Sequence, residues 1–340
     1  GANNAFRPII EILKQSNPIL EDMPFAEGDL PIGNKTTIRT SLPSPSIRRA
    51  NRGTAPTKSD VKQVIDQCMY LEDRSCVDTL LLKLRPAIAG PTARIRRSCV
   101  DTLLLKGKPN PEAYRASEDD AHVEGMGQFV AKCFIYGDLT DPAYTDTFNG
   151  LLVRYPVEEG DKGTRGYQVI SAGTKNTKGH NTSAVIVDWG DRKVTGIFPK
   201  GMTAGLNTKD LGESDVYDSD GNPFRAVQTL YSWQVGLAVQ NVRSVAAIRN
   251  IDVDALSTFT AAQEATFMNK IIFAKNRIQL PKSPIMYVGD TLYSYLETFL
   301  LNKNNVHVTR EMRENEPPLL RFSGIPVKKM DCMTDTEAGF

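Results

Sequence analysis

Residues 29–60 read DLPIGNKTTIRTSLPSPSIRRANRGTAPTKSD and differ in character from the rest of the chain. Four prolines and two glycines interrupt two segments of strand-like composition, residues 35–40 and 46–50. So little apolar surface cannot form a core of its own. The stretch is therefore either a disordered linker or an extended two-stranded arm that lies across a neighbouring molecule. Its β-branched residues, and the prolines and glycines that bound the two segments, favour the arm.

The predicted arm is basic, and a later segment is acidic. Residues 29–60 carry six Lys or Arg against two Asp, a net charge of +4, whereas residues 112–141 carry two against seven, a net charge of −5. The whole chain is nearly neutral at +1, which argues against nucleic-acid binding as its main role. Opposite charges on one chain indicate self-association, although two unrelated solvated surfaces would give the same pattern. The predicted contact residues are Arg39, Arg48, Arg49, Arg52 and Lys58 on the arm, and Glu118, Asp119, Asp120 and Glu124 on the acidic segment.

The acidic segment contains the strongest helix signal, SEDDAHVEGMGQFVAKCFIY at residues 117–136. Ser117 is a favourable N-cap, and the acids that follow it lie where the helix dipole favours negative charge. Gly137 is expected to end the helix. The apolar stripe that would be buried comprises Val123, Met126, Val130 and Phe134.

A short amphipathic helix is predicted near the N-terminus, with Asn4 as its N-cap and residues 16–18 as its end. A helix of about ten residues is marginal alone in water. No apolar segment follows closely enough to cover its stripe, so we expect docking on a distant part of the chain or on another molecule. The docking residues are Phe6, Ile9, Ile10 and Leu13.

The remainder mixes strands and helices without a regular βαβ alternation, which indicates an α+β fold. Strands are predicted at residues 182–189, 193–198, 227–251, 284–288 and 322–330, with Asp191 and Arg192 as a hairpin turn between the first two. A helix is predicted at residues 260–275, where Thr260 and Gln263 form a capping box and Phe259, Phe267, Ile271 and Phe273 are apolar positions. Asp290 is expected to cap a further helix that carries Leu292, Leu296, Phe299 and Leu300.

An identical segment, RSCVDTLLLK, occurs at residues 74–83 and again at residues 97–106. Two copies do not make a solenoid, so the repeat indicates a local duplication or an error in the sequence. The residues between them, 84–96, contain proline and glycine and predict a loop. Only one copy is expected to occupy a regular packed position.

Several classes of protein are disfavoured. Five cysteines, an odd number with no C-x-x-C pair, argue against a disulfide framework or a zinc site and suit a reducing compartment. No apolar run approaches the length of about 18 residues needed to span a membrane. Residues 1–7 lack the pattern of a signal peptide.

A search for catalytic motifs is mostly negative. The sequence has no P-loop, no G-x-G-x-x-G and no H-E-x-x-H. Residues 212–216 lack the last glycine of a nucleophile elbow. Asp218 to Asn222 resemble the start of a calcium loop, but Thr229 stands where that loop needs Glu, so a polar hairpin turn is preferred. No catalytic residue, cofactor or metal is predicted, and a metal-dependent hydrolase using the Asp218 region is a remote alternative.

Taken in order, these elements resemble the Hong-Kong-97-type major capsid proteins of tailed bacteriophages. Short matches follow the same order along nearly the whole chain, and residues 84–106 depart from the pattern. Residues 9–13 and 17–23 resemble the N-arm of that family, residues 27–31 and 39–43 the start of its E-loop, and residues 196–201, 204–206, 248–252 and 322–327 its body.

The resemblance implies an α+β capsid fold with an N-arm, an E-loop, a peripheral domain and an axial domain. The E-loop would lie over an adjacent subunit. The implied division is an N-arm at 1–28, an E-loop at 29–66, a peripheral domain at 67–145 with a spine helix at 117–136 and an inserted repeat at 84–106, an axial domain at 146–318 interleaved with peripheral-domain strands at about 227–251, and a C-terminal strand and tail at 319–340.

The implied function is structural, not enzymatic. Subunits would form pentamers and hexamers and close an icosahedral head around double-stranded DNA, assembled in the bacterial host cytoplasm and located in the virion capsid. Implied partners are other copies, a portal protein, scaffolding or decoration proteins, and DNA through non-specific contact, with no membrane. Some members form a Lys–Asn cross-link, but nothing near Lys35 or Lys58 marks the required carboxylate and Asn, so none is predicted. An encapsulin-type compartment shell, with the same fold and a protein cargo, is the nearest alternative.

Overall fold

The structure is a computed structural model of the chain. It describes residues 17–39, 43, 45–48, 50–58, 61–78, 111–142, 144, 146–173, 176–217, 220–301, 307–313 and 316–339. The chain divides into two compact units, which are described in turn. The larger comprises Asn17–Met69, Ala131–Met202 and Val235–Phe340, and the smaller includes Tyr70–Val130 and Thr203–Gln234.

The larger unit is built on a mixed seven-stranded sheet in the order β11-β12-β13-β10-β5-β9-β4. The interior strand β5 (Asn181–Asp188) pairs with β9 on one edge and β10 on the other, and it is buried along its whole length. This explains its continuous apolar run, since a strand covered on both faces shows no alternation. The other strands are β4 (Val169–Ser171), β9 (Val245–Asp252), β10 (Pro284–Val288), β11 (Val308–Arg313), β12 (Glu316–Phe322) and β13 (Ile325–Lys329).

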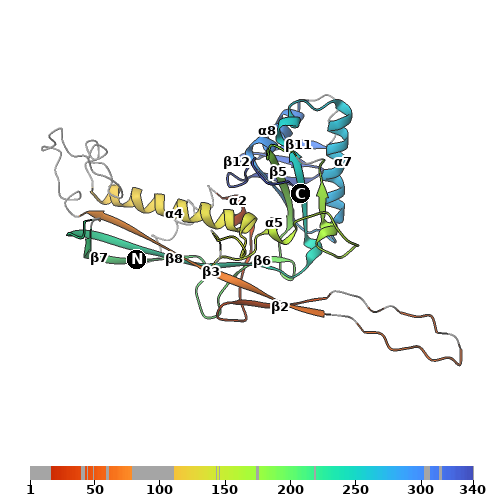
Figure 1. The fold of residues 1–340 in the computed structure, drawn as a ribbon, viewed down its shortest axis with the longest axis horizontal. Coiled ribbons are helices and arrows are strands. Elements are labelled where there is room, and N and C mark those ends of the chain that lie inside the picture. The colour runs from red at the N-terminus through yellow and green to blue at the C-terminus, as the bar shows by residue number, and fades with distance from the viewer. Residues whose placement is uncertain are drawn as a thin grey trace. The chain divides into compact units, whose positions relative to one another are not determined.

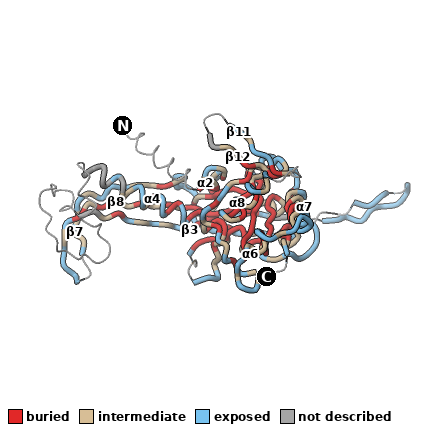
Figure 2. Tube along the Cα trace, turned by 90° about the horizontal axis from the view of Figure 1, so that it is seen from above, coloured by how far each residue is buried: buried red, intermediate tan, exposed pale blue. Residues whose placement is uncertain are grey.

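Helices α7 (Ala261–Arg277) and α8 (Asp290–Phe299), with the short α6 (Val253–Leu256), pack on the sheet face that carries Ile186 (Figure 1). The predicted capping box at Thr260 is confirmed: its backbone N–H donates to Gln263 Oε1 at 2.9 Å. Phe267 and Ile271 are buried as expected, and Figure 2 shows the buried core. Phe273 is not part of the core, because two positions beyond Ile271 the helix turns it outward, where it is 60% exposed.

Two strand predictions and one cap in this unit are corrected. Asp290 is the first residue of α8, and the N-cap is Gly289. The predicted closing strand at 322–330 is instead the end of β12 and all of β13, because Ser323 and Gly324 adopt positive φ angles of 47° and 85° and turn the chain. The predicted hairpin of residues 182–198 is also wrong: β6 (Val194–Phe198) belongs to a different sheet, since both edges of β5 are already occupied.

That second sheet has the order β1-β6-β8-β3-β2, with β7 paired to β8. Its members are β1 (Phe25–Glu27), β2 (Gly33–Arg39), β3 (Val61–Asp78), β6, β7 (Leu206–Tyr217) and β8 (Pro223–Val239). The strands predicted within residues 227–251 are therefore confirmed as β8 and β9. The short helix α2 (Pro18–Asp22), which the sequence analysis did not predict, precedes β1 with Asn17 as its N-cap.

The extended arm is confirmed as a hairpin. β2 pairs antiparallel with β3 from Gly33↔Gln67 to Arg39↔Val61. The predicted second strand at 46–50 is wrong, since its described residues are not in a strand and the chain returns in β3. Prolines at 43 and 45 and the polar sequence that follows disfavour pairing there, whereas Val61, Val64 and Ile65 suit a strand. Figure 1 shows the described connecting residues reaching beyond the ends of both strands.

In the smaller unit, β7 and β8 form a long antiparallel hairpin from Leu206↔Trp233 to Tyr217↔Pro223. The pair at its end confirms the interpretation of Asp218 to Asn222 as a hairpin turn, although Asp218 itself lies outside the described residues. The ring of His122 on α4 (Pro111–Tyr136) stacks at 6.2 Å on Tyr231 of β8, and its Nδ1 lies 2.6 Å from Asp73 Oδ2 on β3.

The long acidic helix is confirmed as α4, with its end at Tyr136 as predicted. Its start is corrected, because the helix begins at Pro111 and passes through Ser117, which is therefore not the N-cap. Proline suits a first helical position, since its missing N–H would have no helical partner there. The predicted stripe is buried at 1% for Val123, 4% for Met126 and 0% for Val130 and Phe134.

Some predictions fall outside the described residues. These are the N-terminal helix, with Phe6, Ile9, Ile10 and Leu13, and the second copy of the repeat. Of the first copy, Arg74 to Asp78 lie in β3. The described cysteines, Cys68, Cys76, Cys133 and Cys332, are free thiols.

Candidate intersubunit arm and its anchorage

The tip of the arm, residues 40–60, is described at residues 43, 45–48 and 50–58, and these form an exposed basic surface. Arg48, Arg52 and Lys58 are exposed, and the Nε–H of Arg48 donates to the backbone oxygen of Arg52 at 3.1 Å. Ile47 beside them is 98% exposed. Arg39 is the last residue of β2, and Arg49 lies outside the described residues. Figure 2 shows the whole described tip as exposed.

Apolar side chains are also exposed nearer the body. Val61 is 57% exposed, Ile65 56%, and Ile32, just before β2, 56%. A large apolar side chain left in water loses roughly 1.5–3 kcal/mol that burial would provide. Exposed apolar residues on a projecting hairpin therefore mark it as a surface that a second molecule can cover.

A buried ion pair holds the root of the arm. The Nη1 of Arg154, the last residue of α5 (Leu151–Arg154), donates to Asp66 Oδ1 of β3 at 2.6 Å. The same guanidinium donates through Nε to Asn149 O at 2.7 Å and through Nη2 to Leu237 O at 3.0 Å. The side chains are only 6% and 2% exposed. Because all three nitrogens are engaged, the guanidinium has one orientation, and it fixes β3 against the body.

Close backbone packing adds to this anchorage. A Cβ on Gly33 would stand 2.0 Å from the backbone oxygen of Asp66, and one on Gly28 would stand 2.4 Å from that of Gly33. On β8, a Cβ on Gly236 would stand 2.6 Å from Gln67 O. These positions have no room for any side chain, so the root of the arm is closely packed, whereas the described residues of the tip are exposed.

The segment before the arm is tied to the seven-stranded sheet by Asp22. Its Oδ1 accepts from Lys328 Nζ at 2.6 Å, and its Oδ2 accepts from the Tyr287 hydroxyl at 2.8 Å. Trp189 Nε1–H donates to the same hydroxyl at 2.8 Å. Burial, then the Asp22 charge, raises the pKa of Tyr287 well above its usual value, so this phenol is neutral and acts as a hydrogen-bond donor.

The acidic contact residues lie between positions 118 and 124 of α4. Glu118 and Asp119 are half-buried, and Asp120 and Glu124 are exposed. Glu124 Oε1 accepts from Gln128 Nε2 at 3.1 Å. Partial burial, followed by the neighbouring Asp119 charge, raises the pKa of Asp120. The pairing of these acids with a basic arm stays a prediction.

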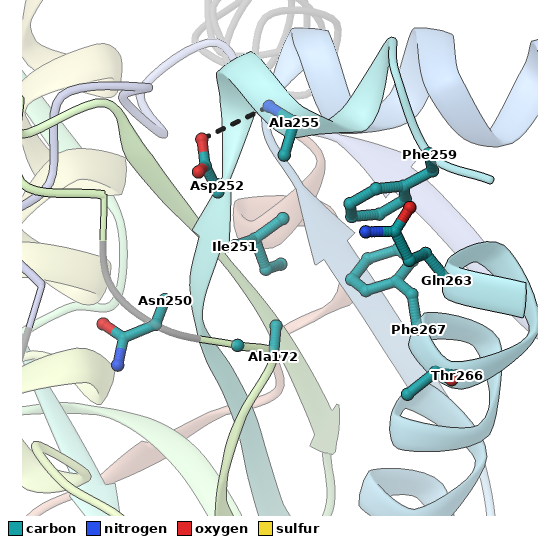
Figure 3. A pocket seen from close by; sticks show the side chains of 10 residues that line it. Ala172, Asn250, Ile251, Asp252, Ala255, Phe259, Gln263, Thr266 and Phe267 are labelled. Atoms are coloured by element: carbon teal, nitrogen blue, oxygen red, sulfur yellow. Dashed lines mark hydrogen bonds between the residues drawn. The ribbon is translucent and has the colours of Figure 1, made fainter.

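The hollow in Figure 3 has the shape of a ligand pocket but no arrangement for acid–base catalysis. It measures about 260 Å³, and Phe259 and Phe267 face Ile251 and Ala172 across it. Its carboxylate, Asp252, is used structurally, because Oδ1 accepts from the backbone N–H groups that begin α6 and from Asn176 Nδ2. No other ionisable residue lines it among those the structure describes.

Across the described ranges, no group of three or more His, Cys, Asp or Glu is placed to hold a metal ion. Within the same ranges, no helix is both long and apolar enough to cross a membrane. The features that stand out are therefore structural. They are an exposed hairpin and the contacts that hold its root in place.

A family model described as major capsid protein GP7 matches residues 1–96 and 91–340, which together span the sequence. The chain belongs to the major capsid protein GP7 family. The two matched segments meet between the two copies of the repeat, where the sequence departs from the pattern of the Hong-Kong-97-type proteins. The search of curated proteins finds no match.

Solved phage capsids resemble this GP7-family chain over nearly all its length. A structure of bacteriophage Epsilon15 aligns with a TM-score of 0.63 at 25% identity, covering 94% of this chain and 88% of that one. The capsid of bacteriophage JBD30 aligns with a TM-score of 0.50 at 10% identity, covering 93% and 91%. At 10% identity, the likeness to the JBD30 capsid shows the fold alone. The α+β Hong-Kong-97-type capsid fold is confirmed.

Sequence reasoning found the arm but not its anchors. The composition of residues 29–60 revealed the hairpin and its basic tip. Asp66 and Arg154 gave no signal, because 88 positions separate them and a lone acid or base in a sequence is usually solvated. From the sequence alone, the glycines at 28, 33 and 236 could be recognised only as residues that interrupt regular structure.

Proposed function

We propose that this capsid protein is the structural subunit of an icosahedral phage head, assembling as pentamers and hexamers around double-stranded DNA, and that it has no catalytic role. The observation that carries the proposal is the arm, a hairpin whose root is held by Arg154 and Asp66 while the described residues of its tip project and are exposed. A rigid root presents the tip at a fixed position, which suits a contact with a neighbouring subunit.

The energetics agree with assembly by many weak contacts. Ordering an extended segment costs roughly 1–2 kcal/mol of entropy per residue, which a bare basic tip cannot offset within one subunit. Each exposed ion pair contributes only about 0–1 kcal/mol. Repeated around a closed shell, such contacts become strong through multivalency. A neighbouring subunit that covers Ile47, Val61 and Ile65 would add the free energy of burying their apolar side chains.

The finer assignments belong to the same proposal. Residues 1–28 serve as the N-arm, 29–66 as the E-loop, 67–145 as the peripheral domain, 146–318 as the axial domain and 319–340 as the closing strand and tail. Portal protein, scaffolding or decoration proteins and packaged DNA are the proposed partners, in a head assembled in the host cytoplasm. No covalent cross-link is proposed, so mature particles should give intact monomer bands on a denaturing gel.

Electron microscopy of the purified protein, paired with light scattering, tests the proposal. Closed shells tens of nanometres across would support it, and nucleic acid inside native particles would distinguish a phage head from a protein-filled compartment. A stable monomer or dimer, with assembly partners present, would contradict it.

A further inference from the structure

A second hollow lies in the larger unit, where the loop of residues 158–168 meets the end of α7 and the short 3-10 helix η3 (Val242–Ser244). It measures about 240 Å³. Its charged lining residues are all cationic: Lys162, Arg243 and Arg277. Amide side chains supply the other polar lining, from Gln168, Asn276 and Gln279. Within the described part of the chain, no carboxylate lines this hollow.

Arg277 is held in one orientation. Its Nη1 donates to the backbone oxygens of Tyr167 and, at 2.7 Å, Val169. Its guanidinium carbon also lies 4.6 Å from the centroid of the Tyr167 ring, in a cation–π contact. The guanidinium cannot swing away into solvent without losing all of these contacts, so its charge is fixed at the hollow.

Arg243 is positioned from the other side. Its Nη1 donates to Gln279 Oε1 at 3.2 Å. Gly163 closes against it with φ +104°, and a Cβ there would stand 3.0 Å from Arg243 Nη2. Glycine therefore gives the loop both its left-handed turn and its close approach to the guanidinium. The turn also places the exposed Lys162 on the lining.

The charge of this region is not balanced by its own acids. Glu158 is the nearest, with Oε1 3.3 Å from Arg277 Nη2. The residues that line the hollow carry three positive charges among themselves. Glu159 and Asp161 belong to the same loop but do not line it. Holding like charges together is unfavourable unless an anion occupies the space between them.

We propose that this hollow is an oxyanion site that takes a phosphate group, either of a nucleic-acid backbone or of a free polyphosphate. Arginine suits phosphate because its planar guanidinium can donate two parallel hydrogen bonds, and lysine adds a point charge. The amide groups of Asn276 and Gln279, which also line the hollow, can donate to the remaining oxygens. The inference goes beyond the shell function and does not depend on it, since binding requires no neighbouring subunit.

Isothermal titration calorimetry of the full chain at low salt tests the site, with pyrophosphate as the first probe and a short DNA duplex as the second. Saturable pyrophosphate binding is expected, weakened at least about tenfold by Arg243→Gln and about threefold by Lys162→Gln, which remove charge-assisted hydrogen bonds. Lys162 is exposed, so its replacement does not threaten folding. Arg192→Gln is the control, because it removes one charge from a side chain that is 90% exposed and lies outside the hollow.

The outcomes separate the two sources of phosphate. Duplex that competes with pyrophosphate, with the same loss in both variants and a steep salt dependence, indicates a backbone phosphate. Binding of pyrophosphate without competition indicates a free polyphosphate. The proposal fails if pyrophosphate does not bind saturably, or if Arg192→Gln weakens binding as much as Arg243→Gln and Lys162→Gln do.

Discussion

Arg154 on α5 and Asp66 on β3 form a buried ion pair with 2.6 Å between Nη1 and Oδ1. Asp66 is 88 positions from Arg154 in the sequence and lies at the point where the projecting hairpin leaves the body. This one contact therefore contributes to the stability of the subunit and also fixes the position of its arm.

Arg154→Met should destabilise the subunit by about 3–5 kcal/mol, because it leaves a buried carboxylate without its charge partner. Urea denaturation followed by circular dichroism measures the change. Arg310→Met is the matched control: it breaks a pair with Glu297 at 3.6 Å in which both side chains are about half exposed, and should cost only about 0–1 kcal/mol. Equal losses in the two variants would contradict the anchoring role of Arg154.

Removing the tip should abolish assembly without unfolding the subunit. Since Arg39 pairs with Val61, residues 40–60 can be replaced by Asn-Gly, which favours a tight hairpin turn. The shortened protein should keep the circular dichroism and urea midpoint of the parent, because the described residues of the tip pack on nothing in the subunit. It should give no shells by electron microscopy. Normal particles from this variant would remove the main support for the arm as an intersubunit contact.

Charge at the tip is tested separately. The double variant Arg48→Glu and Arg49→Glu should remain folded and give fewer shells than the parent, because like charges would face the acidic partner surface. The defect should lessen as ionic strength rises, since salt screens exposed charges. Arg192→Glu with Lys200→Glu makes the same change of charge at exposed body positions and should assemble more nearly as the parent does. Particle yield by light scattering is the readout.

The sequence was most informative where one local rule dominates. Thr260 and Gln263 form a capping box that needs only neighbouring residues, and β5 was evident from a continuous apolar run. Ser117 was misjudged because a good N-cap residue does not stop a helix that Pro111 has already begun. The hairpin of β5 and β6 failed for a non-local reason, as both edges of β5 are taken by strands that come later in the chain. Arg154, Asp66 and Asp22 share this difficulty, since burial gives them their importance.

Two glycines near the same helix should respond in opposite directions to alanine. A Cβ on Gly125, inside α4, would meet nothing within 4 Å, so Gly125→Ala should stabilise the protein by roughly 0.5–1 kcal/mol through the higher helix propensity of alanine. A Cβ on Gly137, directly after α4, would stand 2.4 Å from Phe148 O and 2.6 Å from Cys133 O. Gly137→Ala should therefore destabilise. If both variants shift the urea midpoint in the same direction, the close approach of Phe148 O and Cys133 O is not the reason for glycine at 137.

Glu337 should make stability depend on pH in the sense opposite to that of a carboxylate whose pKa is lowered by folding. It is 8% exposed, and its carboxylate accepts from the Tyr136 hydroxyl at 2.6 Å and from the Ser183 hydroxyl. Its backbone N–H donates to Asn181 O at 2.9 Å, which ties the C-terminal tail to β5.

Burial raises the pKa of Glu337 and outweighs the lowering by its two hydroxyl donors and by the Arg249 charge, while Asp335 raises it further. Because the folded state then holds this proton more tightly than the unfolded state, the stabilising contribution is fully present below the unfolded pKa. It is lost as pH rises through the higher folded value.

Glu337→Gln keeps a neutral hydrogen-bonding group and removes the titration. The variant should match the parent at about pH 4 and gain stability relative to it as pH rises toward about 8. Thermal denaturation across that range measures the difference. Glu297→Gln, at a side chain 48% exposed, should show no such gain. A stability difference for Glu337→Gln that does not change with pH would mean that the carboxyl holds the same charge in both states, and it would contradict a raised pKa in the folded state.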